Sequence, residues 1–177
     1  RYTSLSRISE LNKAKNYFTK KYIFLDRDGV INHKPKKLEY VDNINKFKWK
    51  NEFLKFIKNL RDKNTELIVI SNQAGVARKK LTKNILNQIN ILINKKLKKY
   101  RLKISAFYYC THHWNENCMC RKPKPGLILL AQNSKLIKFS NSIFIGDSET
   151  DEQAAKNLNI NFFKVVKKES FDRIKIK

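Results

Sequence analysis

The stretch that decides the fold is Tyr22-Ile-Phe-Leu-Asp-Arg-Asp-Gly-Val-Ile-Asn32. Its first four residues are apolar and predict a short buried strand. Side chains alternate along an extended segment, so we expect Asp26 and Asp28 on one side and Arg27 pointing away, with Gly29 permitting a sharp turn. Two carboxylates held at a strand end repel each other. A divalent cation between them would remove that conflict and attract an anionic substrate.

Apolar, β-rich segments recur along the chain, and amphipathic helical stretches lie between most of them. Alternating strands and helices predict an α/β fold with a parallel sheet covered on both faces. Ligands of such sheets bind beyond the carboxyl ends of the strands. We expect a helical extension over residues 1–20 and the main domain over 21–177. The expected strands are Tyr22–Leu25, Leu67–Ile70, Ala106–Cys110, Ser142–Ile145 and Phe162–Val166, and the expected helices are 51–60, 81–100, 126–136 and 149–158.

The composition fits one globular domain, because 41% of the 177 residues are hydrophobic and 31% are charged. No apolar run reaches the roughly 18 residues that cross a bilayer, and no secretory signal is visible, so we expect a cytoplasmic protein without a membrane partner. The net charge of +24 attracts phosphorylated solutes. The lysines are spread along the whole chain, as drift in an AT-rich genome would also produce, so nucleic acid is not the favoured partner. We expect a monomer.

Polar side chains follow two further strands at the same predicted edge. Ser71-Asn72-Gln73 ends the second strand and offers a hydroxyl and backbone N–H groups to phosphate oxygens. Asp147 follows the fourth strand, and Asp151 lies one helical turn later, on the same face. We therefore expect a third carboxylate, from Asp147, at the metal site.

Three thiols and an imidazole lie close together in the segment after the third strand. The pattern Cys-x-His, five residues, Cys-x-Cys supplies the four ligands of tetrahedral zinc, at Cys110, His112, Cys118 and Cys120. All four positions are filled, so we interpret this zinc as structural, ordering a loop with little apolar content. Three buried, unconnected cysteines are the alternative. Arg121, Lys122 and Lys124 follow on a segment stiffened by prolines and can pair with phosphate.

These blocks, in this order, resemble the haloacid-dehalogenase-like (HAD) phosphatases, and within them the zinc-containing branch that holds the heptose-bisphosphate 7-phosphatases and the histidinol-phosphate phosphatases. The blocks are Asp-Arg-Asp-Gly from Asp26, Ser-Asn-Gln from Ser71, Arg-Lys-Pro from Arg121, Gly-Asp ending at Asp147, and the zinc pattern. The resemblance covers about residues 22–166. It implies a three-layer, Rossmann-like HAD fold with no large cap domain and with a zinc-stabilised loop.

The resemblance also implies a role for each matching residue. Asp26 would attack phosphorus, Asp28 would act as acid and base, and Ser71 and Lys122 would steady the transferring phosphoryl group. The implied substrate-binding residues are Tyr40, Asn72, Gln73 and Arg121. The implied Mg²⁺ ligands are Asp26, Asp147 and the backbone carbonyl of Asp28, and the implied Zn²⁺ ligands are Cys110, His112, Cys118 and Cys120.

The expected function is that of a Mg²⁺-dependent phosphatase acting on a small phosphorylated metabolite through an aspartyl-phosphate. D-glycero-D-manno-heptose 1,7-bisphosphate is the expected substrate, cleaved at the 7-phosphate. The alternatives are histidinol phosphate, a polynucleotide 3′-phosphate held by the basic surface, and a zinc-stabilised interaction module without activity. Residues 33–39 are longer and more basic than the family's segment that touches the sugar, and their lysines are candidates to engage a second phosphate.

Overall fold

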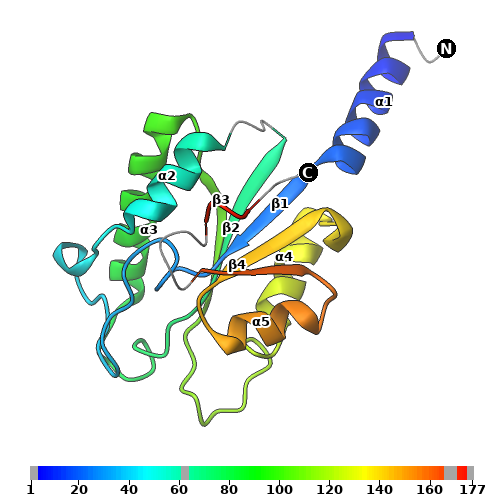
Figure 1. The fold of residues 1–177 in the computed structure, drawn as a ribbon. Coiled ribbons are helices and arrows are strands. Elements are labelled where there is room, and N and C mark those ends of the chain that lie inside the picture. The colour runs from blue at the N-terminus through cyan, green and yellow to red at the C-terminus, as the bar shows by residue number, and fades with distance from the viewer. Residues whose placement is uncertain (1–3, 61–63, 166–170, 175–177) are drawn as a thin grey trace.

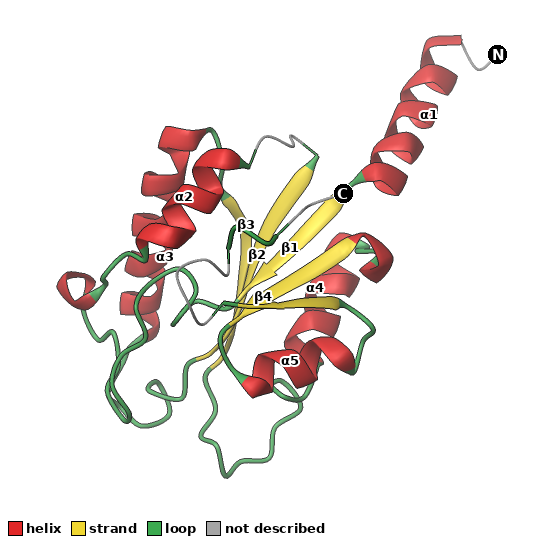
Figure 2. Cartoon of the chain, viewed as in Figure 1, coloured by secondary structure: helices red, strands yellow, loops and turns green. Residues whose placement is uncertain are grey.

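The computed structural model describes residues 4–60, 64–165 and 171–174 and contains a five-stranded parallel sheet (Figures 1 and 2). The strands lie in the order β3-β2-β1-β4-β5, so β1 is central and carries the Asp-Arg-Asp-Gly motif at its carboxyl end. Their bounds are β1 Lys21–Leu25, β2 Thr65–Asn72, β3 Ile104–Cys110, β4 Ser142–Gly146 and β5 Asn161–Lys164. The predicted parallel α/β sheet is confirmed.

Helices cover both faces of the sheet, which makes three layers (Figure 2). The elements α2 and α3 pack on one face and α4 and α5 on the other. The strand β1 shows why, since Ile23 and Leu25 face the first core while Tyr22 and Phe24 face the second. The helices are α2 Asn51–Asn59, α3 Lys83–Leu97, α4 Gly126–Lys135 and α5 Glu149–Lys156, with short 3₁₀ helices η1 Ile44–Lys46, η2 Lys98–Tyr100 and η3 Phe139–Asn141.

Local signals fix several element ends. Thr82 caps α3 by accepting a hydrogen bond from the N–H of Ile85, as its residue type predicts. The expected helix 81–100 changes to a 3₁₀ turn in its last three residues, and Arg101 then adopts a left-handed conformation that stops it. The strand β5 is shorter than expected, and Val166 lies outside the described residues.

The helix α1, Ser4–Thr19, precedes β1 and extends away from the sheet (Figure 1). The side chains of Ile8 and Leu11 are 53% and 68% exposed, so this part of the apolar stripe of α1 does not pack on the domain. Between β1 and α2 the chain forms loops, η1 and two isolated β-bridges, consistent with a HAD fold that lacks a large cap. Among the described segments, no helix has the length and apolarity needed to cross a membrane.

Candidate active site

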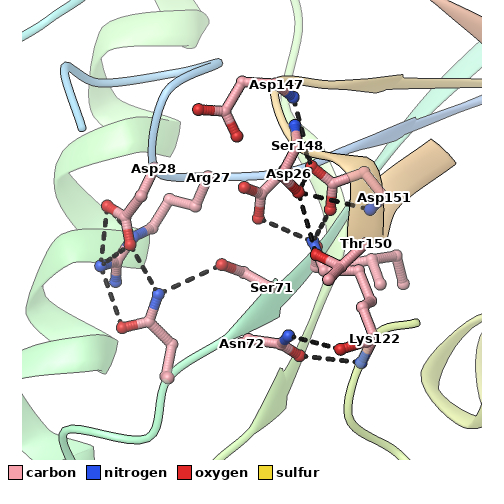
Figure 3. Close-up of polar contacts among 12 residues, drawn as sticks. Asp26, Arg27, Asp28, Ser71, Asn72, Lys122, Asp147, Ser148, Thr150 and Asp151 are labelled. Atoms are coloured by element: carbon pink, nitrogen blue, oxygen red, sulfur yellow. Dashed lines mark hydrogen bonds and ion pairs between the residues drawn. The ribbon is translucent and has the colours of Figure 1, made fainter. Parts of the chain in front are cut away.

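The carboxyl ends of the strands bring the predicted catalytic residues to one cavity of about 340 Å³. Asp26 follows β1, Ser71 lies near the end of β2, and Asp147 follows β4 (Figure 3). Parallel strands end at a common edge, so three segments far apart in sequence supply one site. The cavity is also lined by Asp28, Tyr40, Asn72, Gln73, Arg121, Lys122 and Asp151.

Three carboxylates form a candidate cation site. Asp26, Asp147 and Asp151 each offer an oxygen, and these oxygens lie within 4.8 Å of one another. Gly29 has a φ of +95°, and a Cβ atom there would overlap the carboxylate of Asp147, so the close approach requires glycine. The Oδ1 atom of Asp147 is buried and has no hydrogen-bond partner among the residues that the structure describes. Oxygen ligands of this kind suit Mg²⁺.

Lys122 is buried in the middle of this acidic group. Its ammonium donates to Oδ1 of Asp26 at 2.9 Å and to the carbonyl of Ile70 at 2.9 Å, and it lies 2.5 Å from Oδ1 of Asp151. Burial opposes its charge, but the charges of Asp26 and Asp151 raise the pKa of Lys122 above its ordinary value. Burial raises the pKa of Asp26 to about 6, although Lys122 opposes this change. Lys122 therefore stays charged and partly neutralises the carboxylates.

The carboxylate of Asp28 lies outside the group of three carboxylates and is bound by neighbouring polar side chains. The prediction that Arg27 points away from Asp28 is wrong, because the fully buried guanidinium of Arg27 donates to both carboxylate oxygens of Asp28, at 2.8 Å and 3.1 Å. Asn32 and Gln73 also donate to this carboxylate, each at 2.8 Å. Burial opposes ionisation of Asp28, but the charge of Arg27 and these hydrogen bonds lower its pKa overall.

The two amides expected to bind substrate make contacts within the protein. The side chain of Asn72 donates to the carbonyl of Lys122 and accepts from its N–H, both at 3.1 Å (Figure 3). Gln73 is 2% exposed and donates to Asp28 and, at 3.1 Å, to the Ser71 hydroxyl. Both amides line the cavity. In this arrangement they position Lys122, Asp28 and Ser71.

The cavity wall opposite the strand ends is basic. Residues 34–40 line it without a gap, and the ammonium of Lys34 donates to Oδ2 of Asp147 at 2.8 Å. At the end of this wall, the Tyr40 hydroxyl accepts a hydrogen bond from Arg78 at 3.0 Å. Arg121 lines the cavity too, and its Nη1 atom is buried without a hydrogen-bond partner in the described part of the chain. An anionic or carbonyl group in the cavity would satisfy that donor.

The four predicted zinc ligands meet in one cluster. The sulfur of Cys110 lies 3.6 Å from that of Cys118, which lies 3.5 Å from that of Cys120. Nδ1 of His112 lies 3.1 Å from the sulfur of Cys120 and 3.8 Å from that of Cys110. Tetrahedral zinc with Zn–S bonds of about 2.3 Å places ligand atoms about 3.5–3.8 Å apart. Three of the four separations given above lie in this range, and the separation between His112 and Cys120 is shorter, so the cluster is close to the geometry of a zinc site. His113 lies outside the cluster, with its ring 4.1 Å from that of Trp114.

The family is decided by a comparison with protein-family models. The model described as polynucleotide kinase 3 phosphatase matches residues 21–167, which include the whole sheet and both candidate metal sites. The chain belongs to this family of HAD-like phosphatases.

Two curated relatives of the phosphatase are named as heptose-bisphosphate phosphatases. It is 34% identical over 143 residues to the D-glycero-beta-D-manno-heptose-1,7-bisphosphate 7-phosphatase of Helicobacter pylori, which covers 80% of this chain and 81% of the relative. It is 36% identical over 149 residues to the D-glycero-alpha-D-manno-heptose-1,7-bisphosphate 7-phosphatase of Campylobacter jejuni, which covers 84% of each. These two relatives act on different anomers.

A solved structure agrees with these relatives. The phosphatase superposes with a TM-score of 0.75 and 27% identity on the D,D-heptose 1.7-bisphosphate phosphatase from B. bronchiseptica, complexed with magnesium and phosphate. The match covers 81% of this chain and 79% of that one. A phosphatase of this fold has therefore been solved in complex with magnesium and phosphate.

Sequence reasoning missed three features of the phosphatase's site. The bidentate contact of Arg27 with Asp28 was missed because side-chain alternation does not describe a long arginine that folds back beside its own strand. The contact of Lys34 with Asp147 joins residues 113 apart in sequence and has no local signal. A local signal does exist for the contact of Asp151 with Lys122. The four-residue spacing from Asp147 to Asp151 predicts that the helix brings Asp151 back to the same face as Asp147.

Proposed function

We propose that this phosphatase hydrolyses the 7-phosphate of D-glycero-D-manno-heptose 1,7-bisphosphate in a Mg²⁺-dependent reaction through an aspartyl-phosphate. The observation that carries the proposal is a single cavity that holds an acidic cation site, a buried lysine and a basic wall. The heptose-bisphosphate phosphatases among its relatives support this substrate.

The nucleophile in this proposal is Asp26. Its Oδ1 atom is held by Lys122, which leaves the other carboxylate oxygen to attack phosphorus in line with the leaving group. Asp26, Asp147 and the backbone carbonyl of Asp28 would hold Mg²⁺, with Asp151 as a further carboxylate nearby. When bound, the ion neutralises the phosphoryl oxygens and so permits approach of an anionic nucleophile. Lys122 and the Ser71 hydroxyl would hold the remaining phosphoryl oxygens.

Asp28 is the proposed acid and base. In the structure Arg27 and Gln73 favour its ionised form, so it must gain a proton before it can give one to the departing alkoxide. A phosphoryl group bound beside Asp28 raises its proton affinity, because a like charge disfavours the carboxylate. After the proton has gone to the leaving group, Asp28 is the base that activates water against the aspartyl-phosphate. General acid–base catalysis of this kind is typically worth about 10²–10⁴-fold.

The basic wall favours a bisphosphate over histidinol phosphate, which has one phosphate. Lys36 and Lys37 line the cavity, are exposed, and have no ion-pair partner in the described segments. They line the same cavity as the carboxylates, and their ammonium groups would pair with a second anionic group of the same substrate. We therefore assign to them recognition of the phosphate that is not cleaved.

A panel of substrates tests the function. Phosphate release is measured with Mg²⁺ on both anomers of the heptose bisphosphate, on histidinol phosphate and on a 3′-phosphorylated oligonucleotide. We expect kcat/KM to be highest for one heptose anomer, and no release from any of them by Asp26→Asn. A higher kcat/KM on histidinol phosphate or on the oligonucleotide would contradict the assigned substrate.

The lysine assignment has its own test. The double variant Lys36→Ala/Lys37→Ala should lose activity on the bisphosphate and keep it on the corresponding 7-monophosphate. The matched control is Lys55→Ala/Lys58→Ala, which removes the same charge from α2, outside the catalytic cavity. Equal losses on both substrates, or an equal loss in the control, would contradict a second-phosphate site.

We also propose that the Cys₃His cluster holds structural zinc and that the enzyme works as a cytoplasmic monomer. The ligand spacing supports the zinc. Three thiols in a metal-binding arrangement suit a reducing compartment, which supports the location. Metal analysis and light scattering of the purified enzyme test the zinc and the monomer; a dimer or a protein without zinc would contradict them.

A further inference from the structure

Arg78 contacts aromatic side chains from two different loops. Its guanidinium carbon lies 4.8 Å from the centroid of the Trp114 ring and 5.8 Å from that of the Tyr40 ring. Its Nη1 atom also donates a hydrogen bond of 3.0 Å to the Tyr40 hydroxyl. A planar cation suits this arrangement, since guanidinium can stack on a ring and donate in its own plane at the same time.

The two loops contacted by Arg78 belong to different proposed sites. Trp114 belongs to the zinc loop, residues 110–121, and is 48% exposed. Tyr40 belongs to the substrate loop, residues 33–42, whose residues 34–40 form the basic wall of the catalytic cavity. Arg78 therefore stands between the loop that a metal would order and the loop that would meet the substrate.

The turn that carries Arg78 is itself fixed to both loops. The N–H of Ala77 donates to the carbonyl of Thr111 at 3.2 Å, which ties the turn to the zinc loop. On the other side, a Cβ atom added to Gly75 would lie 2.7 Å from Cδ1 of Tyr40, so the ring of Tyr40 packs directly on the turn backbone. The position of Arg78 is thus set by backbone contacts, and its side chain completes the connection.

We propose that Arg78 is a positioning residue that couples the zinc loop to the substrate loop and so sets the affinity for substrate. Trp114 fixes the guanidinium, and the guanidinium fixes Tyr40 and with it the end of the basic wall. Arg78 does not line the cavity, so it acts through Tyr40. The inference rests on the proposed function in one respect, namely that residues 33–42 meet the substrate.

The kinetic test uses Arg78→Gln. The hydrogen bond from the guanidinium to Tyr40 and the cation–π contacts with Trp114 and Tyr40 are lost. We expect KM for the best substrate to rise about tenfold while kcat stays within about twofold. Arg78→Lys retains the charge without the planar guanidinium, so its KM should lie between those of the wild type and Arg78→Gln. The control is Lys80→Gln, an exposed residue of the same turn that loses the same charge and should leave both constants unchanged. A fall in kcat with unchanged KM would overturn the proposal.

The second test uses no substrate, so it separates failure of this inference from failure of the proposed function. The chain has two tryptophans, and in a Trp49→Phe background Trp114 is the only one. Adding Tyr40→Phe removes the acceptor of Arg78 and should change Trp114 emission, because the guanidinium shifts over the indole. In an Arg78→Gln background the same Tyr40→Phe change should leave emission unchanged. Coupling would be refuted by an equal change in both backgrounds or by no change in either.

Discussion

Replacing Asp26, the proposed nucleophile, should stabilise the enzyme and abolish turnover. Asp26 is buried, and burial raises its pKa from 3.8 to about 6 even with Lys122 at 2.9 Å. The ionised form is therefore unfavourable in the folded enzyme relative to the unfolded chain. Asp26→Asn keeps an oxygen that can accept from Lys122, and Lys122 keeps its contact with Asp151. We expect the variant to lose all phosphatase activity and to gain folding stability.

The magnitude and the pH window follow from the pKa change. Because the folded enzyme binds this proton more tightly than the unfolded chain, stability falls as the pH rises from about 4 to about 6, and the full cost is present above that range. A rise from 3.8 to about 6 corresponds to about 3 kcal/mol. The increase in the free energy of unfolding caused by Asp26→Asn should approach this value at about pH 8 and be roughly half of it near pH 5.

Urea unfolding of the purified enzyme in Mg²⁺-free buffer measures this gain at both pH values. The control is Asp28→Asn, for which the opposite sign is expected. Since Arg27, Asn32 and Gln73 lower the pKa of Asp28, its carboxylate stabilises the fold above its ordinary pKa of 3.8, and that stability is lost as the pH falls. If Asp26→Asn were no more stable than the wild type at pH 8, the reasoning about its burial would be refuted.

Three further variants probe the rest of the site. Lys122→Met leaves two buried carboxylates without their cation, so we expect a loss of about 3–5 kcal/mol in urea unfolding without Mg²⁺; an unchanged midpoint would contradict its buried ion pairs. Gly29→Ala places a Cβ atom against Asp147, and Mg²⁺ affinity measured by titration calorimetry should fall about 10–100-fold, whereas wild-type affinity would argue against Asp147 as a ligand. Cys110→Ser removes a buried residue that we propose as a zinc ligand, so metal analysis should show far less than one zinc per chain; retention of zinc would exclude the proposed cluster.

Much of the fold was predictable because its determinants are local. The apolar run before Asp26 indicates a buried strand, and Thr82 marks the start of α3. The parallel order then places Ser71 and Asp147 beside Asp26 without any knowledge of the long-range contacts. The ligand spacing from Cys110 to Cys120 likewise specifies a cluster within one short segment.

The remaining features depend on long side chains that cross between segments. Arg27 was expected to point away, yet a three-carbon stem brings its guanidinium back to Asp28. Lys34 reaches Asp147 across the cavity, and Arg78 reaches Tyr40 and Trp114. Sequence periodicity predicts the face of a strand or helix from which a side chain leaves, but not where the charged end of a long side chain lies. These contacts can be seen only in the assembled fold.

The contacts of Lys122 join segments that are made at different times during synthesis. Its ammonium touches Asp26, 96 residues earlier, and the carbonyl of Ile70, 52 residues earlier, as well as Asp151 later in the chain. Contacts of such separation form late, because the intervening chain must be ordered first. A growing polypeptide on the ribosome thus cannot complete the contacts of Lys122 until Asp151, in α5, has emerged.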